Sequence, residues 1–417
     1  MARSAVREIP VASVGMQRGE VLVPTQLGDP VHGLLPCLAA PLVAGSLRAK
    51  GRLARVADLP PDESDADGRL FVVTCPQANG STAAIAAAAA PGEALSAAAA
   101  RAAVEEWAGV SGSRTALIAG SPWCSGALHA ASAAHAAAAE HRGTGRRVHV
   151  LAPVAMPAET ARSLAELGAV VTGSLAAVER GDVVVFPAHG VTDETRADTA
   201  RRGATVVDAT CPLVAAAQNA AARAGDHNNQ LVLIGQPGHA ATEPIMSKAP
   251  GHVTAVENLA NAAAVRVGDS GQVSYLMLPG IELEAGAPIV SALRSRYPAV
   301  RGAVPGDVCY APSDRAGTIY SVALGSDVML VAGDPQSADA RQISGQGRDA
   351  GTRVHIIGDV ADIRPAMLAS VHTIGLAEST SAPAGLIAQV LAALSGLGRL
   401  TVARRRLSTE DATSVLA

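Results

Sequence analysis

Short apolar runs alternate with amphipathic stretches along most of this 417-residue chain. From Arg114 onward the apolar runs are rich in Val, Ile and Leu, which is typical of strands buried on both faces. Helical stretches such as 157–168 and 288–297 lie between them. Because strands that alternate with helices form mostly parallel sheets, we expect an α/β fold. Its strands are predicted at 115–120, 147–153, 183–188, 205–209, 231–235, 273–278, 328–333, 353–358 and 372–377.

The first 112 residues repeat this pattern in a looser form. Strands are expected at 20–26, 52–59 and 69–76, and a helix at 36–51 that Gly51 ends. Residues 77–112 are low in complexity, and helix propensity alone predicts a helix over 92–110. We therefore interpret 1–112 as an N-terminal α/β extension with an Ala-rich helical connector.

Cysteines mark the units of the remaining chain. ATVVDATCPLVAAA (204–217) predicts a buried strand, a turn that carries Cys211, and a helix that begins at Pro212. Cys124 and Cys309 lie in comparable places, 87 residues before and 98 residues after Cys211. This spacing divides the chain into the extension, three α/β units at 113–211, 212–308 and 309–396, and a C-terminal tail at 397–417.

A cysteine before the first turn of a helix faces unpaired N–H groups and the positive end of the helix dipole, which favours the thiolate. Three such thiolates can hold a [4Fe–4S] cluster or a zinc ion and leave one coordination position open. The spacing also fits ordinary buried cysteines, because it contains no CxxC pair. For Cys37 and Cys75, plain burial is the preferred interpretation.

The amino-acid composition argues against several classes of function. Charged residues make up 17% of the chain, net charge is −4 and aromatic residues are 2%, which argues against nucleic-acid binding. Five cysteines without framework spacing, and a start without a signal-peptide pattern, indicate reduced thiols and a cytoplasmic location. No strongly apolar run reaches roughly 18 residues, so no membrane span is expected.

Loops after the predicted strands carry further candidate groups. His189 and His239 each follow a strand directly, and the small polar loops 333–342 and 377–383 follow two others. Ligands of open α/β sheets bind at the carboxyl ends of the strands, where the cysteine-bearing loops also lie. This shared position predicts a single site.

Six motifs carry a family resemblance: PWCSG, PAHGV, DATCPLV, IGQPGH, DVCYAPSDR and TSAP, in this order. Residues 114–396 resemble the 4-hydroxy-3-methylbut-2-enyl diphosphate reductase (LytB) family. The resemblance implies three α/β units around a pseudo-threefold axis and a [4Fe–4S] cluster on Cys124, Cys211 and Cys309. It also implies that His189 and His239 contact a diphosphate, and that Ser337 and Ser381 donate hydroxyl hydrogen bonds to it.

The implied reaction removes an allylic hydroxyl group with two electrons and protons, giving isopentenyl and dimethylallyl diphosphate. A ferredoxin or flavodoxin is the implied electron donor, and the chain carries no dinucleotide-binding fingerprint that would replace it.

Several positions depart from the family pattern. Ala241 stands where the family has a proton-relaying glutamate, which leaves Glu243 as the candidate proton donor. Pro279 lies where a threonine hydroxyl is expected, and Met156 replaces a histidine. In the phosphate loop an SSN triplet becomes Ser337-Ala338-Asp339.

Acidic residues also stand near the predicted phosphate loops, at Asp334, Asp339 and Glu378. A carboxylate about 4 Å from a phosphate costs about 4 kcal/mol at an effective dielectric near 20, which weakens diphosphate binding unless Arg315, Arg341 or a bound cation offsets the charge or the acids point to solvent. Two alternatives therefore stay open beside the family reductase. One is a paralogue that reductively dehydroxylates or dehydrates another small substrate, and the other is a non-catalytic iron–sulfur sensor or electron relay.

Overall fold

A computed structural model describes residues 5–13, 15–29, 31–59, 67–152, 158–302 and 307–408. The chain forms two compact units. Unit 1 combines Met1–Pro122 with Gly317–Arg406, and unit 2 combines Trp123–Ala316 with Leu407–Ala417. Each is described by itself.

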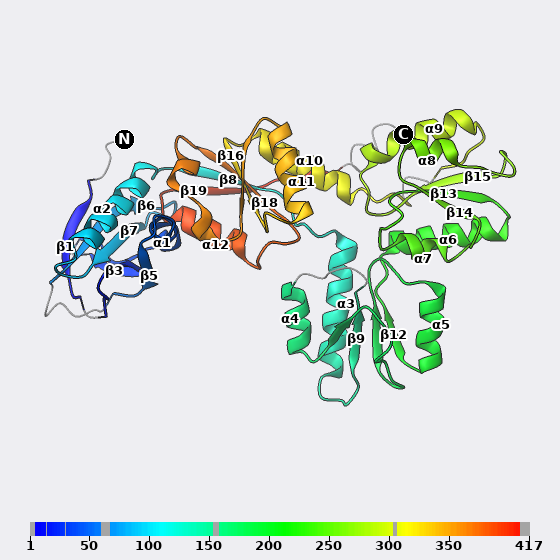
Figure 1. Cartoon of the computed structure of the whole chain (residues 1–417), viewed down its shortest axis with the longest axis horizontal. Coiled ribbons are helices and arrows are strands. Elements are labelled where there is room, and N and C mark those ends of the chain that lie inside the picture. Colours follow the sequence, from blue (N-terminus) through cyan, green and yellow to red (C-terminus); the bar gives the residue numbers. More distant parts are fainter. Residues whose placement is uncertain are drawn as a thin grey trace. The chain divides into compact units, whose positions relative to one another are not determined.

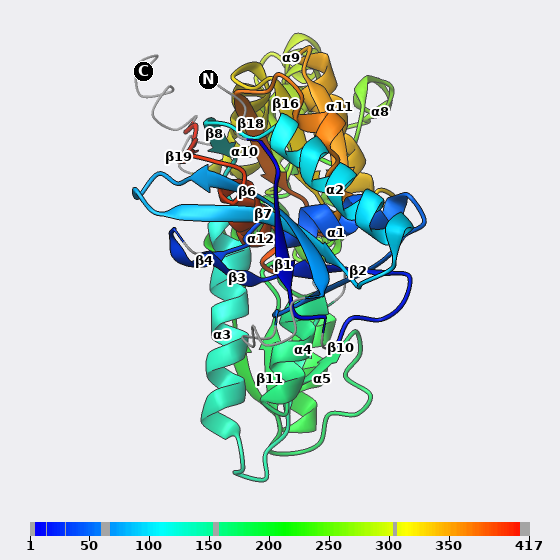
Figure 2. The ribbon, with the colours of Figure 1, turned by 90° about the vertical axis from the view of Figure 1, so that its left-hand side faces the viewer.

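The N-terminal part of unit 1 is a five-stranded sheet with two helices and a hairpin (Figures 1 and 2). The strand order is β1 (Arg7–Val11), β6 (Gly68–Pro76), β7 (Thr82–Ala89), β2 (Glu20–Pro24), β5 (Leu53–Ala57). β2 and β5 are parallel, and the other pairs are antiparallel. Helices α1 (Ala40–Ala49) and α2 (Ala94–Gly109) pack on this sheet, and β3 (Gln26–Asp29) pairs with β4 (Gly33–Pro36). The sheet confirms the α/β extension and adds β1 and β7, which the pattern did not predict.

The second sheet of unit 1 is entirely parallel. Its order is β17 (Arg353–Ile357), β16 (Val328–Ala332), β18 (Thr373–Glu378), β8 (Arg114–Ile118), β19 (Leu400–Arg404). Helices α10 (Ala311–Leu324), α11 (Ala338–Asp349) and α12 (Leu386–Ser395) accompany it, with short 3-10 turns η2 (Val360–Asp362) and η3 (Pro365–Leu368). The predicted boundaries grouped 114–118 with the next unit and treated 400–404 as tail. Both segments instead pair within this sheet, because β8 lies between β18 and β19.

One hydrophobic core joins the two sheets of unit 1. It contains Leu70 and Phe71 of β6 and Trp107 of α2 together with Leu330 of β16 and Leu376 of β18. Trp107 is fully buried, and its indole N–H donates to Ser46 Oγ of α1 at 3.1 Å. Helix α2 is therefore a part of the core and not a connector.

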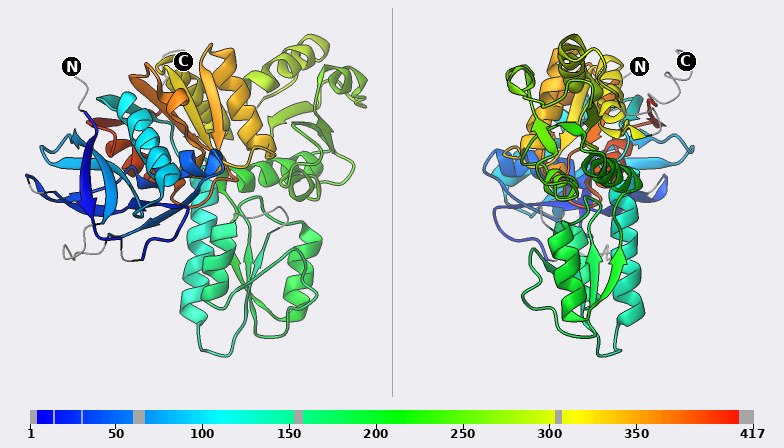
Figure 3. Two further views of the ribbon diagram at one scale, coloured as in Figure 1. Left: turned by 60° about the vertical axis from the view of Figure 1, so that its left-hand side comes forward. Right: turned by 90° about the vertical axis from the view of Figure 1, so that its right-hand side faces the viewer.

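Unit 2 contains two parallel sheets (Figures 1 and 3). The first has the order β10 (Val170–Thr172), β9 (Val148–Leu151), β11 (Val183–Phe186), β12 (Thr205–Asp208), with helices α3 (Ser125–His141), α4 (Ala158–Glu166) and α5 (Asp193–Arg202). The second has the order β14 (Val253–Val256), β13 (Gln230–Ile234), β15 (Val273–Met277), with α6 (Pro212–Asp226), α7 (Thr242–Met246), α8 (Leu259–Ala264) and α9 (Leu283–Arg296). All nine strands predicted after Arg114 are present, and the α/β class with mostly parallel sheets is confirmed.

Within the described ranges, the helices are all too short or too polar to cross a lipid bilayer.

Candidate functional site

Helix starts position the three predicted cysteines of unit 2. Cys124 is the N-cap of α3, and its Sγ accepts the Ala127 N–H at 3.4 Å. Cys211 is the N-cap of α6, and Pro212 begins the helix as predicted. Cys309 precedes α10 by two residues. The Cys124 and Cys309 thiols therefore lie beside backbone N–H groups at a helix start, whereas the Cys211 side chain makes no capping hydrogen bond.

Two observations show that these thiols lie near one another. A β-carbon built on Gly126 would lie 2.7 Å from Cys211 Sγ and 3.9 Å from Cys124 Sγ. Burial raises the pKa of the Cys309 thiol, and the negative charges of Cys124 and Cys211 raise it further, whereas N–H groups of Ala311 and Gly280 hold it down. Cys211 Sγ and Cys124 Sγ thus both lie close to Gly126, and Cys309 lies near enough to both cysteines for their charges to affect its thiol.

Three thiolates are ligands that suit an iron–sulfur cluster or a zinc ion. Within the described ranges, no three His, Cys, Asp or Glu side chains converge to hold one metal ion. In a four-iron cluster each thiolate binds a different iron, so the sulfur atoms need not meet at one point. Cys37 and Cys75 are buried in unit 1, and burial raises their thiol pKa values to about 12 and about 11, which suits inert core residues.

His189 and His239 form a pair at the ends of β11 and β13. Their ring centroids are 5.3 Å apart and their planes meet at 80°. Burial lowers the pKa of both imidazoles, and the positive charge of a protonated His189 lowers the pKa of His239 further. Both rings are therefore neutral near pH 7 in the ligand-free chain.

The His239 tautomer follows from its hydrogen bond. His239 Nδ1 accepts the Ala241 N–H at 3.2 Å, so the neutral ring carries its proton on Nε2. This Nε2 faces Gly280, where an added β-carbon would lie only 2.9 Å away. Because the Gly280 N–H also reaches the Cys309 thiol, the 279–280 loop lies between the histidine pair and the cysteines.

The candidate proton donor lies apart from these groups. Glu243 is exposed in the first turn of α7, and no hydrogen bond of its carboxylate to the described histidines or cysteines is seen. Ala241 at the N-cap of α7 is fully buried and offers only its backbone. Met156 lies outside the described residues.

Ser337 and Ser381 belong to unit 1, at the carboxyl ends of β16 and β18. Ser337 is the N-cap residue of α11, but its side chain makes no capping hydrogen bond. The Ser381 hydroxyl accepts the Asp334 N–H at 3.0 Å and lies 2.9 Å from the Ser379 hydroxyl. Of the two predicted hydroxyl donors, Ser381 already has one partner in its own loop, Ser379, and one in the loop after β16, Asp334.

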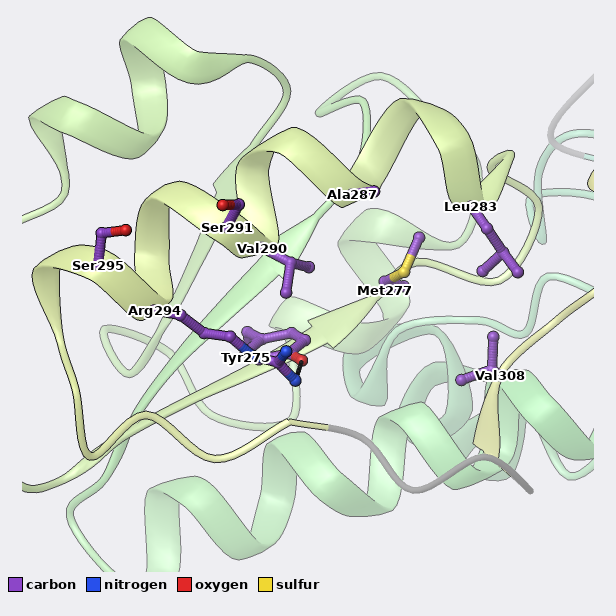
Figure 4. Close-up of a pocket in the computed structure, with 9 residues that line it drawn as sticks. All are labelled: Tyr275, Met277, Leu283, Ala287, Val290, Ser291, Arg294, Ser295 and Val308. Carbon is purple, nitrogen blue, oxygen red and sulfur yellow. Dashed lines mark hydrogen bonds between the residues drawn. The ribbon is translucent and has the colours of Figure 1, made fainter. Parts of the chain in front are cut away.

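A separate pocket of about 600 Å³ lies between β15 and α9 (Figure 4). Tyr275 and Met277 form one wall, and Arg294 donates to the Tyr275 hydroxyl at 2.9 Å. Val308 also lines it, next to Cys309, but its described lining includes none of the predicted site residues. The pocket is therefore distinct from the cysteine and histidine groups.

Sequence reasoning missed Gly126 and Gly280, which allow the close approaches described above. Gly126 lies in the first turn of α3, where glycine costs about 1 kcal/mol relative to alanine. A glycine two residues after a cysteine, at a position that favours a helix former, was the available signal.

The structure is an α/β fold in which three thiols at helix starts and two histidines lie after the carboxyl ends of strands, where such folds bind their ligands. Residues 116–395 match the LytB protein family. The chain is 39% identical over 230 residues to 4-hydroxy-3-methylbut-2-enyl diphosphate reductase 2 of Mycobacterium bovis, covering 55% of this chain and 70% of that protein. It is 30% identical over 279 residues to the reductase of that name from Mannheimia succiniciproducens, covering 66% of this chain and 88% of that protein.

Solved structures agree in fold. The corresponding reductase structure from Plasmodium falciparum gives a TM-score of 0.60 at 20% identity over 71% of this chain and 93% of that chain. A second structure of this terminal enzyme of the non-mevalonate pathway gives 0.54 at 21% identity over 67% of this chain and 99% of that chain. The chain therefore belongs to the LytB family, and the predicted family and oxidoreductase class are confirmed.

Proposed function

We propose that this chain is an iron–sulfur reductase that acts on 4-hydroxy-3-methylbut-2-enyl diphosphate. The reaction takes up two electrons and two protons, breaks the allylic C–O bond, and yields isopentenyl or dimethylallyl diphosphate and water. The observation that carries this proposal is the approach of Cys124, Cys211 and Cys309 at three loop ends in a member of the LytB family.

Cys124, Cys211 and Cys309 would hold the [4Fe–4S] cluster. Bound there, the cluster supplies a Lewis acid for the departing hydroxyl oxygen and a path for the electrons. The protein contributes N–H groups around the sulfur atoms, such as those of Ala127 and Ala311, which stabilise negative charge on the thiolates.

His189 and His239 would bind the diphosphate. His239 presents an N–H at Nε2, because its Nδ1 is occupied by the Ala241 N–H. The approach of an anion raises the pKa of an imidazole, so each ring gains a proton more readily once the diphosphate lies beside it. Ser337 and Ser381 would donate hydroxyl hydrogen bonds to the same group.

Proton delivery has to differ from the family pattern. Neither the Ala241 side chain nor Pro279 can carry a proton, and Glu243 is exposed. We therefore assign Glu243 as the proton donor through intervening water. Electrons come from a ferredoxin or flavodoxin type of protein, which the family resemblance implies.

A second candidate function is supported by the same departures. A paralogue that reductively dehydroxylates or dehydrates another small substrate needs the cluster but not the family's proton relay. The buried Ala241 and the acidic Asp339 favour this candidate, because both change groups around the substrate and leave the cysteines intact.

The decisive experiment purifies the full chain without oxygen, measures iron and sulfide, and adds the allylic diphosphate with a strong one-electron reductant. We expect about four irons per chain and formation of both isomeric products. An intact cluster without turnover would remove the first candidate and leave the second. A chain that binds no iron after reconstitution would remove both.

Gly126→Ala provides a sharper test of the cysteine geometry. Its methyl group would overlap Cys211 Sγ, so we expect bound iron to fall to less than half. Gly173→Ala is the matched control, because an added β-carbon there meets nothing within 4 Å. Equal iron content in the two variants would contradict the assignment of Cys211 as a ligand.

A further inference from the structure

The pocket between β15 and α9 has a charged end and an apolar end (Figure 4). Arg294 projects from α9 toward Tyr275 of β15 at one end, and Met277, Leu283 and Val308 line the other. Residues 283 and 294 lie about 16 Å apart along the helix. The pocket volume of about 600 Å³ is typical of sites for small molecules. A ligand that fills this pocket is therefore elongated, with one polar end and one apolar end.

Tyr275 holds the Arg294 guanidinium at the charged end. Arg294 donates to the Tyr275 hydroxyl at 2.9 Å, and its guanidinium carbon lies 5.8 Å from the centre of the Tyr275 ring. Tyr275 itself is buried, and a β-carbon added at Gly302 would overlap its hydroxyl, so the ring has little freedom to move. The bond to Tyr275 uses one of the five N–H donors of the guanidinium, and among the described residues Arg294 forms no ion pair with an acid. Arg294 can therefore bind an anion without giving up its bond to Tyr275.

The charge of the lining selects the kind of anion. Arg294 is the one charged side chain in the described lining, and Ser291 and Ser295 are the other polar side chains of α9 there. One guanidinium matches one carboxylate, with which it can form two parallel hydrogen bonds, whereas a diphosphate carries more negative charge than it can balance. α9 has Glu284 in its first turn and Arg294 in its last turn, so the charges along the helix also direct an anionic group toward Arg294.

The apolar end suits an aliphatic chain. A β-carbon added at Gly286 would lie 2.5 Å from Met277 Cε, which shows how closely α9 packs on the end of β15. Leu283, Ala287 and Val308 complete the apolar part of the described lining there. Each methylene group that leaves water for such a surface strengthens binding about fourfold.

We propose that this pocket is a binding site for a carboxylate with an aliphatic chain of medium length. The carboxylate binds Arg294 and the Tyr275 hydroxyl, and the chain extends along α9 toward Val308. Such a ligand contacts two segments that lead into the predicted site, because Val308 precedes Cys309 and Met277 precedes the 278–280 loop. The site is separate from the residues assigned to the diphosphate, and the inference does not depend on the proposed function.

The test measures binding of decanoate to the full chain by calorimetry, below the concentration at which decanoate forms micelles. We expect one decanoate per chain, and a Kd at least fivefold higher for Arg294→Gln than for the wild type. Arg296→Gln is the matched control, because it removes the same charge from the same turn of α9, while Arg296 lies over the Tyr297 ring and donates to the Ala262 carbonyl. Its Kd should stay within twofold of the wild type.

Two further variants separate loss of the site from loss of folding. Arg294→Lys keeps the charge and should bind more tightly than Arg294→Gln, with the same thermal midpoint for both. Ala287→Phe should fill the apolar end and abolish binding, whereas Ala285→Phe, at an exposed position of α9 outside the described lining, should not. Equal binding by these two Phe variants would overturn the placement of the chain in the pocket.

The choice of ligand tests the two ends independently. Octanoate, which is shorter by two methylene groups, should bind about tenfold more weakly than decanoate. Decylamine, whose end is positive, should bind at least tenfold more weakly. Equal affinity for decanoate and decylamine would overturn the role of Arg294, and tighter binding of geranyl diphosphate that Ala287→Phe abolishes would overturn the carboxylate in favour of a diphosphate. These measurements require no turnover, so failure of the reductase proposal would leave them valid.

Discussion

Single residues decide the charge of the histidine pair. Burial lowers the pKa values of His189 and His239 below the ordinary value of about 6.5, so the folded chain binds protons less readily there than the unfolded chain does. This contribution to stability is complete above about pH 6.5 and is lost as the pH falls through the lower folded pKa values. The ligand-free chain should therefore lose stability on acidification.

We predict that His239→Gln makes this loss of stability on acidification smaller. Thermal unfolding from about pH 8 to about pH 5 should show a smaller fall in Tm for His239→Gln than for the wild type. His129→Gln, which changes an exposed histidine of α3, should follow the wild type. Parallel curves for all three proteins would show that the pair does not titrate in this manner.

At the scale of single residues, the sequence predicted where the cysteines lie, but it could not predict hydrogen bonds from the backbone to distant side chains. Cys124, Cys211 and Cys309 were recognised because a helix start after a strand is visible in the pattern, and the structure places all three there. The hydrogen bond from Thr380 to Asp339 links residues 41 positions apart, so no local pattern reports it. The roles of Glu243, Ser337 and Ser381 stay predictions.

At the scale of secondary-structure elements, close packing between short elements contributes to stability. Gly45 lies in the middle of α1 against the 3-10 turn η2, and an added β-carbon would lie 2.6 Å from Ala361 Cα. Because the obstacle is backbone, it cannot rotate away as a side chain does. We expect Gly45→Ala to lower the free energy of unfolding by about 1–3 kcal/mol in urea titrations.

Gly109→Ala, at the end of α2, is the control for this substitution. An added β-carbon at Gly109 meets nothing within 4 Å, so helix propensity alone should apply and raise stability by up to about 1 kcal/mol. A similar loss in both variants would contradict the packing argument.

The periodicity identified strands well but could not identify their partners. β8 precedes Cys124, the first of the three predicted cluster cysteines, yet it pairs with β18 and β19, far away in the sequence. The choice of a parallel partner depends on long connections that leave no local signal. β7 was missed for another reason: residues 83–89 are alanine and isoleucine, all buried, and alanine favours a helix unless tertiary packing overrides it.

At the scale of the whole molecule, the N-terminal extension is a structural part of unit 1. The sequence indicated an added α/β unit, because its strands and helix repeat the later pattern. It could not show that its core continues into the sheet of β16 and β18, because a shared core depends on which faces meet. A shared core should unfold as one cooperative structure.

Replacement of Trp107 tests this cooperativity in the full chain. Trp107 is fully buried in α2, and Trp107→Ala removes a large side chain at a cost of about 3–5 kcal/mol. If the core is shared, amide hydrogen exchange should accelerate together in β6, β7, β16 and β18, while β13 and β15 of unit 2 keep their protection. Leu95→Ala in the same helix is the control, since Leu95 is 72% exposed and its loss should change little. Faster exchange confined to β6 and β7 would instead mean that the extension folds independently of the sheet that carries Ser337 and Ser381, and that its removal would leave those loops intact.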